Sequence, residues 1–107
     1  MTQNEKVKQL IFDALDDINA QLSEEQQLEK STTSALYGEK GKLDSLGLVN
    51  FIVAVEQKVQ DELGFAITLA TERAMSQQHS PFRTVQSLIN YIIELLEEKG
   101  YGERNNT

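Results

Sequence analysis

The residues best suited to chemistry are Asp44 and Ser45, which lie where a loop with two glycines gives way to an apolar stretch. Asp and Ser are favoured at helix starts because their side-chain oxygens accept hydrogen bonds from the free N–H groups of the first turn. The pattern predicts a helix over residues 45–63, with the Ser45 hydroxyl facing solvent at its tip. A phosphate ester on Ser45 would be stabilised by the partial positive charge there. Taken alone, the two residues indicate only a helix cap.

Apolar residues occupy two faces of this predicted helix. A stripe suited to a core recurs at helical spacing and consists of Leu48, Phe51, Ile52, Val55 and Val59. A second stripe starts beside the serine and consists of Leu46, Val49 and Val53. A helix on a single-sided core needs only one stripe. The second stripe therefore packs against another helix or forms a partly exposed contact surface next to Ser45, and both can hold at different positions.

These residues resemble the acyl carrier protein family, which includes the peptidyl and D-alanyl carriers. The match lies in Leu43-Asp44-Ser45-Leu46, in the following Val49 and Glu56, and in the stretch of residues 84–92 near the end. It spans nearly the whole chain, from about residue 7 to residue 96. The resemblance implies an all-α fold and a carrier function.

In such carriers a phosphopantetheinyl transferase esterifies the serine with 4′-phosphopantetheine from coenzyme A. The arm's thiol then holds an acyl or aminoacyl group as a thioester. The resemblance implies that Ser45 is the attachment residue and that the adjacent Asp44 helps the transferase and its metal ion to engage. Enzymes that activate and transfer the acyl group are the expected partners, and the residues expected to dock onto them are Leu46, Val49, Val53 and Glu56.

Several residues depart from the pattern of the carriers in fatty acid synthesis. Asn50 stands where an acid is usual, Gly47 and Leu48 replace polar residues, and Lys58 adds a positive charge. The loop before the serine and the segment before the last helix are longer than is typical. We therefore expect a specialised, stand-alone carrier for a dedicated pathway of fatty acid or secondary metabolite biosynthesis. Fatty acyl, hydroxyacyl, aminoacyl and polyketide cargoes all remain open.

Catalysis by the chain itself is not expected. Nucleophilic catalysis needs a serine and a base held by a third group, and the only histidine, His79, lies in a predicted turn. The sequence lacks a nucleotide-binding glycine loop and a His or Cys pattern for zinc. The alternative to a carrier is an unmodified helical interaction module of the same fold, in which Ser45 is only a cap. The intact Asp-Ser-Leu favours the carrier.

Composition and charge narrow the class of partner. The chain has 107 residues, of which 39% are hydrophobic and 25% charged, and this suits one globular domain. The formal charge of −7 argues against nucleic acid or an anionic membrane and favours basic partner surfaces. No cysteine is present, so nothing indicates a secreted disulfide scaffold. We expect no signal peptide, no membrane span and a cytoplasmic monomer.

The predicted fold is a small four-helix bundle of the acyl carrier type, with a short third helix. Helices are expected at residues 3–22, 45–63, 71–76 and 84–99, with one helical turn near 24–28. Thr2 and Glu5 suggest a capping box for the first helix, and either Ser80-Pro81 or Thr84 begins the last. Residues 1–99 form the carrier domain, and residues 100–107 a mobile C-terminal tail.

Core positions follow from the same periodicity. The first helix is expected to bury Val7, Ile11, Ala14, Leu15, Ile18 and Leu22, with Leu10 at the margin. The last helix is expected to bury Val85, Leu88, Ile89, Ile92, Leu95 and Leu96. An extended segment at residues 65–69 should cross the core. Further core contributions are expected from Phe12, Phe51, Phe65 and Phe82.

Overall fold

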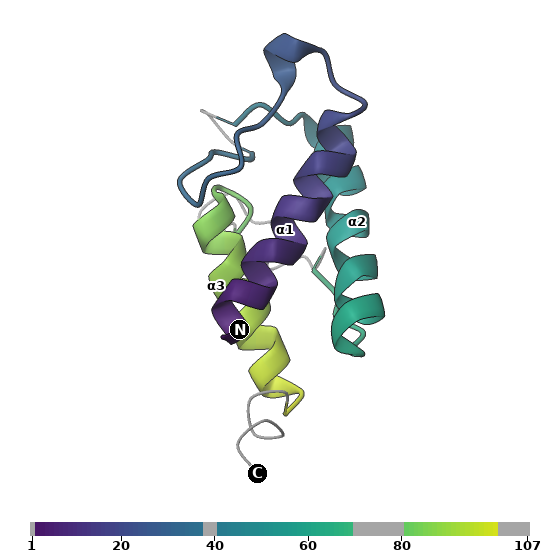
Figure 1. Ribbon diagram of the computed structural model, residues 1–107, viewed down its shortest axis with the longest axis vertical. Coiled ribbons are helices and arrows are strands. Elements are labelled where there is room, and N and C mark those ends of the chain that lie inside the picture. Colours follow the sequence, from purple (N-terminus) through teal and green to yellow (C-terminus); the bar gives the residue numbers. More distant parts are fainter. Residues whose placement is uncertain (1, 38–40, 70–80, 101–107) are drawn as a thin grey trace.

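The computed structural model describes residues 2–37, 41–69 and 81–100 and, at Ser45, the backbone alone. These residues form three α-helices, α1 (Gln3–Asn19), α2 (Ser45–Leu63) and α3 (Val85–Glu98), and one 3₁₀ turn, η1 (Glu24–Gln26). Helix α1 packs against both α2 and α3 (Figure 1). The all-helical class is confirmed for this part of the chain. The helix expected at 71–76 and the tail at 101–107 lie outside it, so the four-helix count stays a prediction.

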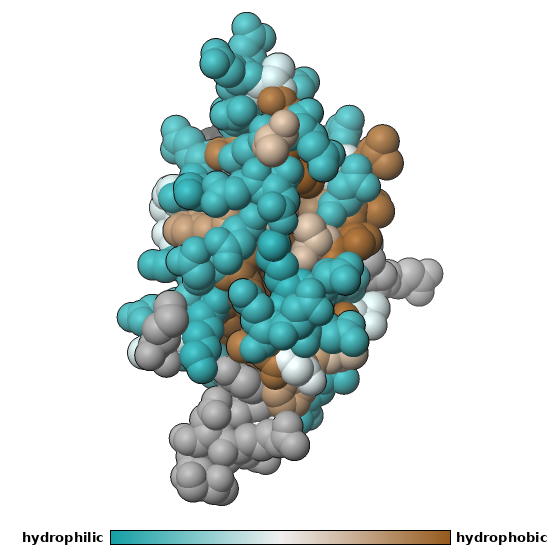
Figure 2. Space-filling model, turned by 45° about the vertical axis from the view of Figure 1, so that its right-hand side comes forward, coloured by the Kyte–Doolittle hydropathy of each residue, from teal (hydrophilic) through white to brown (hydrophobic). Residues whose placement is uncertain are grey.

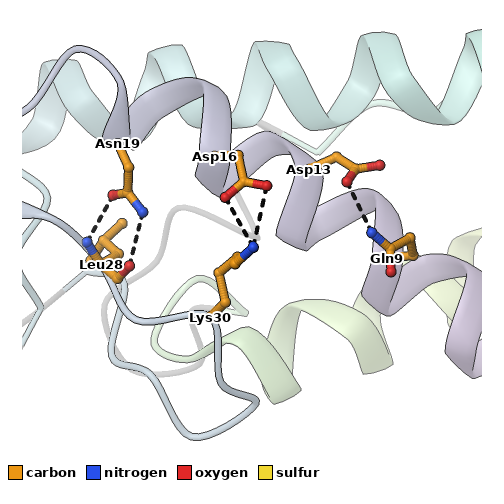
Figure 3. Close-up of polar contacts among 6 residues, drawn as sticks. All are labelled: Gln9, Asp13, Asp16, Asn19, Leu28 and Lys30. Atoms are coloured by element: carbon orange, nitrogen blue, oxygen red, sulfur yellow. Dashed lines mark hydrogen bonds and ion pairs between the residues drawn. The ribbon is translucent and has the colours of Figure 1, made fainter.

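Helix α1 begins as predicted and ends earlier than predicted. The Thr2 hydroxyl oxygen accepts the N–H of Glu5 at 3.1 Å, which forms one half of the expected capping box. The expected end at residue 22 is wrong, because the helix stops at Asn19. The Asn19 amide accepts the Leu28 N–H at 2.8 Å and donates to the Leu28 carbonyl at 2.9 Å (Figure 3). This two-bond contact fixes the loop against the end of the helix.

The core lies between the three helices and matches most of the predicted stripes. Every core position predicted on α2 is at most 1% exposed. On α1, Leu10 is only 2% exposed and belongs to the core rather than to its margin. Phe82 is fully buried, whereas Leu22, Phe12 and Phe65 are partly buried against the core. Each large apolar side chain buried in this way contributes about 1.5–3 kcal/mol before the loss of conformational entropy.

The long loop between α1 and α2 is hydrogen-bonded to the start of α3. The backbone carbonyls of Ser34 and Thr32 accept the N–H groups of Val85 and Gln86 at 3.1 and 2.9 Å. First-turn N–H groups have no partner within their own helix, so the loop satisfies two of them. An isolated antiparallel bridge between Ala35 and Thr84 continues the pairing. The loop is thus attached to two helices.

Thr84 is the N-cap of α3. Its hydroxyl accepts the Ser87 N–H at 3.1 Å, and the Ser87 hydroxyl accepts the Thr84 N–H at 3.1 Å. The structure therefore selects Thr84 over Ser80-Pro81 as the start of the last helix. After α2, Gly64 adopts a left-handed φ of 77° and ends the helix as predicted. None of the helices in the described residues has the length and apolarity that a membrane crossing requires.

Candidate functional site

The candidate site lies at the N-terminus of α2. Asp44 has an extended backbone, and its Oδ1 accepts the N–H of Gly47 at 2.6 Å. Its carbonyl oxygen accepts the N–H of Leu48 at 2.9 Å, and α2 starts at Ser45. The predicted helix start and the capping role of Asp44 are confirmed. The side chain of Ser45 lies outside the described part of the chain, so its outward hydroxyl stays a prediction.

Gly47 allows close packing directly under this cap. A Cβ atom at position 47 would lie 3.1 Å from Asp44 Oδ1 and 3.2 Å from Leu43 Cδ2. Both contacts are tighter than ordinary van der Waals distances, so a side chain there would displace the capping carboxylate or the buried Leu43. The sequence analysis treated Gly47 only as a departure from the carrier pattern. The structure shows that the glycine fits the cap.

The chain doubles back on itself just before it enters the site. The Leu43 N–H donates to the carbonyl of Leu36 at 3.0 Å, which closes the loop at its base. Within this loop, a Cβ on Gly41 would overlap backbone atoms of Tyr37 and Leu36. Lys42 Nζ donates to the carbonyl of Gln27 at 3.1 Å. The approach to Asp44 is therefore held by backbone contacts that require a glycine.

The second apolar stripe of α2 is exposed. Leu46 is 70% exposed, Val49 46% and Val53 54%, and these are the exposed large hydrophobic residues of the described chain. Figure 2 shows hydrophobic side chains at the surface along one side of the molecule. Of the two alternatives that the sequence left open, the structure supports the exposed surface. It begins in the residue next to Ser45 and continues along the helix.

Glu56 continues the line of this stripe but has a partner within the chain. Its side chain is half-buried, and Oε2 accepts the N–H of Leu69 at 2.6 Å. The bond fixes the segment after α2 against the helix, and Leu69 and Ile67 are buried there. Sequence reasoning missed this contact because the two residues belong to different segments and share no local pattern. The role of Glu56 in partner binding stays a prediction.

The acidic residues of α1 have several partners of their own. Asp17 Oδ2 lies 3.0 Å from Lys58 Nζ, and this pair links α1 to α2. The hydrogen bond that Lys58 donates to the Asp17 carboxylate raises the pKa of Lys58 above its ordinary value. Asp16 pairs with Lys30 at 3.2 Å, and the Asp13 carboxylate accepts a hydrogen bond from Gln9 (Figure 3).

Among the described residues, no group of three or more His, Cys, Asp or Glu is arranged to hold a metal ion. Of the acids on α1, Asp16 and Asp17 are exposed and ion-paired. Comparison with protein-family models, curated proteins and solved structures gave no significant match. The geometry at the start of α2 is therefore the basis for assigning a function.

Proposed function

We propose that this chain is a carrier protein. In this proposal Ser45 carries 4′-phosphopantetheine, whose thiol holds an acyl or aminoacyl group. One observation supports it above the others: the Asp44-Ser45-Leu46 sequence stands at the first turn of α2, and the exposed stripe of Leu46, Val49 and Val53 continues from it. A modifying enzyme needs access to the serine, and a partner enzyme needs a surface next to the attached arm. The exposed stripe offers such a surface on the helix that begins at Ser45, and access to the serine itself is part of the proposal.

The residues at the start of α2 suit a phosphodiester. The N–H of Gly47 is occupied by Asp44, whereas the first two N–H groups of a helix lack acceptors within it. At α2 these belong to Ser45 and Leu46 and lie in the positive field of the helix terminus. When bound, the arm supplies the thiol for thioester chemistry. The chain presents the arm, while the exposed Asp44 carboxylate engages the transferase and its metal ion.

The finer expectations belong to the same proposal. A fourth, short helix in the region outside the described residues would complete a bundle of the carrier type. The partners are a phosphopantetheinyl transferase and the enzymes that load and unload the arm, in a dedicated biosynthetic pathway of the cytoplasm. The chain itself performs no catalysis. Helix α2 buries one apolar stripe in the core and exposes the second, which supports a structural role for the first face and a docking role for the other.

Intact-mass spectrometry tests the attachment. Purified protein is incubated with coenzyme A and a broad-specificity phosphopantetheinyl transferase. We expect wild type to gain one phosphopantetheine group and Ser45→Ala to gain none. Ser23→Ala is a matched control, because Ser23 also stands exposed at the start of a helical turn and its side chain makes no capping hydrogen bond. It should be modified like wild type.

Unmodified wild type would contradict the carrier proposal. In that case the alternative function, an unmodified helical interaction module, would remain, and the exposed stripe on α2 also supports it. Modification of Ser45→Ala would place the attachment at another residue. If instead wild type is modified and Ser45→Ala is not, a mass spectrum of the protein isolated from its own cells would identify the cargo.

A further inference from the structure

The exposed face of α2 carries no formal charge over most of its length, although the protein has a formal charge of −7. We call this surface the neutral face. Its exposed positions between residues 46 and 60 are Leu46, Val49, Asn50, Val53, Gln57 and Gln60. Three are apolar and three carry a side-chain amide.

Of the charged residues of α2, Glu56 lies at the edge of this face, and the others pair with another helix or lie at its C-terminal end. Glu56 is half-buried and accepts the Leu69 N–H, and Lys58 is neutralised by Asp17. The segment of residues 64–69, which is tied to α2 through Leu69, contains no charged residue. The remaining acids of the helix region are Asp44 before it and Asp61 and Glu62 in its last turn.

Distance weakens the effect of these end charges. With a rise of about 1.5 Å per residue, Val53 lies about 13 Å along the axis from Asp44 and about 12 Å from Asp61. The Debye length at physiological ionic strength is about 8 Å. The centre of the neutral face is therefore screened from both ends. Among the α2 residues, the opposite charge nearest to this centre is the half-buried Glu56 carboxylate, which already accepts the Leu69 N–H. A basic patch placed over the face would therefore lose hydration for little electrostatic gain.

We propose that the neutral face docks a partner protein whose contact surface is apolar at its centre and uncharged at its rim. Leu46, Val49 and Val53 supply the apolar contact. The amides of Asn50, Gln57 and Gln60 both donate and accept hydrogen bonds, so they match amide, hydroxyl or backbone groups. Net charge alone pointed to basic partners, and the local surface reverses that expectation. The inference takes its docking role from the proposed carrier function.

The test uses two helical peptides as probes of partner chemistry. Both have the same length and the same Leu/Ala apolar face, but one has Gln and Ser at its rim and the other Lys. Each is titrated into unmodified, ¹⁵N-labelled protein, and amide shifts are followed by NMR. We expect the Gln/Ser peptide to shift the amides of Leu46, Val49 and Val53. Its affinity should change less than about twofold between about 50 and 300 mM NaCl, because no charge pair forms.

Two variants locate the binding. Val53→Glu should weaken the Gln/Ser peptide about tenfold or more, because docking would bury an unpaired carboxylate. Asn90→Glu adds the same charge at an exposed position on α3 and should leave the affinity unchanged. Urea unfolding of Val53→Glu should match that of wild type, since the side chain is 54% exposed. A weakened interaction then reports on the surface rather than on folding.

Four results would overturn the proposal. The Lys peptide could bind the neutral face more tightly, with an affinity that falls steeply with salt. The Gln/Ser peptide could leave the amides of this face unshifted. Neutral phosphatidylcholine vesicles could bind the face in a way that Val53→Glu abolishes, which would assign it to lipid. Shifts that depend on protein concentration alone would assign it to a second copy. No step requires modification of Ser45, so this proposal and the carrier function can fail separately.

Discussion

Asp44 combines a structural and a proposed functional role, and two substitutions can separate them. Its Oδ1 caps α2 through the 2.6 Å hydrogen bond from Gly47, and its charge is proposed to engage the transferase and metal ion. Asp44→Asn keeps an oxygen acceptor, and Asn caps helices about as well as Asp. Asp44→Ala removes the acceptor and the charge together. The pair therefore tests the cap and the charge independently.

The expected magnitudes follow from the geometry. Loss of an N-cap costs about 0.5–2 kcal/mol. The Asp44 side chain is exposed, so water can partly replace it, and we expect about 1 kcal/mol for Asp44→Ala. Asp44→Asn loses only the attraction between the charge and the helix terminus, which is about 0.3–1 kcal/mol at low salt and is screened at high salt. Each 1 kcal/mol lowers the melting temperature of a domain of this size by about 4–8 °C.

Two assays read the two roles. Urea unfolding followed by far-UV circular dichroism gives the free energy of unfolding, and intact mass with time gives the rate of modification at Ser45. At high salt, Asp44→Asn should be as stable as wild type and Asp44→Ala clearly less stable. Both should be modified far more slowly than wild type. Modification of Asp44→Asn at the wild-type rate would refute the role of the charge. Unchanged stability of Asp44→Ala would refute the capping contribution.

Three further substitutions test contacts that hold the loop and the helices. Asn19→Ala removes both hydrogen bonds to the loop backbone and should lower the free energy of unfolding by about 1–3 kcal/mol, measured in urea. Gly41→Ala forces a Cβ onto the backbone of Tyr37, so it should cost about 1–3 kcal/mol in thermal unfolding and shift the Tyr37 amide resonance. Lys58→Gln should cost up to about 1 kcal/mol at neutral pH. The Asp17 hydrogen bond raises the Lys58 pKa, so this difference is full below the ordinary lysine value of about 10.4 and disappears as the pH rises through the higher folded-state pKa.

Each of these has a control or a contradicting result. Asn90→Ala removes an exposed amide whose side-chain partner is Gln86, and it should change stability by less than about 0.5 kcal/mol. If Asn19→Ala changed the free energy of unfolding no more than Asn90→Ala does, the Asn19 amide would not hold the loop. Native stability of Gly41→Ala would show that the loop adapts to a side chain. A Lys58→Gln difference that persists in alkali would assign the effect to packing rather than to charge.

Helix α2 could be predicted to the residue because its signals are local. Asp44 supplies the cap, the core stripe repeats along the helix, and Gly64 has the left-handed backbone that ends it. The exposed stripe was also recognisable, because a second apolar face has no place in a single-sided core. Its exposure, however, was one of two alternatives. It depended on which elements pack beside α2, and this is not encoded in the stripe itself.

Two of the missed contacts join residues that belong to different segments of the chain. The periodicity of α1 continues toward Leu22, but the Asn19 amide bonds the backbone of Leu28 and the helix stops there. The sequence pointed to Glu56 only as a residue that docks onto partners, and it gave no sign that this carboxylate accepts a hydrogen bond from Leu69. Such contacts depend on how the chain returns to a helix after leaving it. No pattern of neighbouring residues reports that geometry.

The attachment of the loop to α3 also sets an order for folding. The carbonyls of Thr32 and Ser34 accept hydrogen bonds from the N–H groups of Gln86 and Val85. These contacts close a loop of about 50 residues, and the conformational entropy of that loop is lost before the contacts can form. Helices α1 and α2 can pair earlier, since fewer residues separate them. A nascent chain that stops before Phe82 would lack the carbonyls of Arg83 and Phe82, which accept the N–H groups of Leu36 and Tyr37. The backbone at Leu36 and Tyr37 would therefore take its final form only after Phe82 and Arg83 had been synthesised.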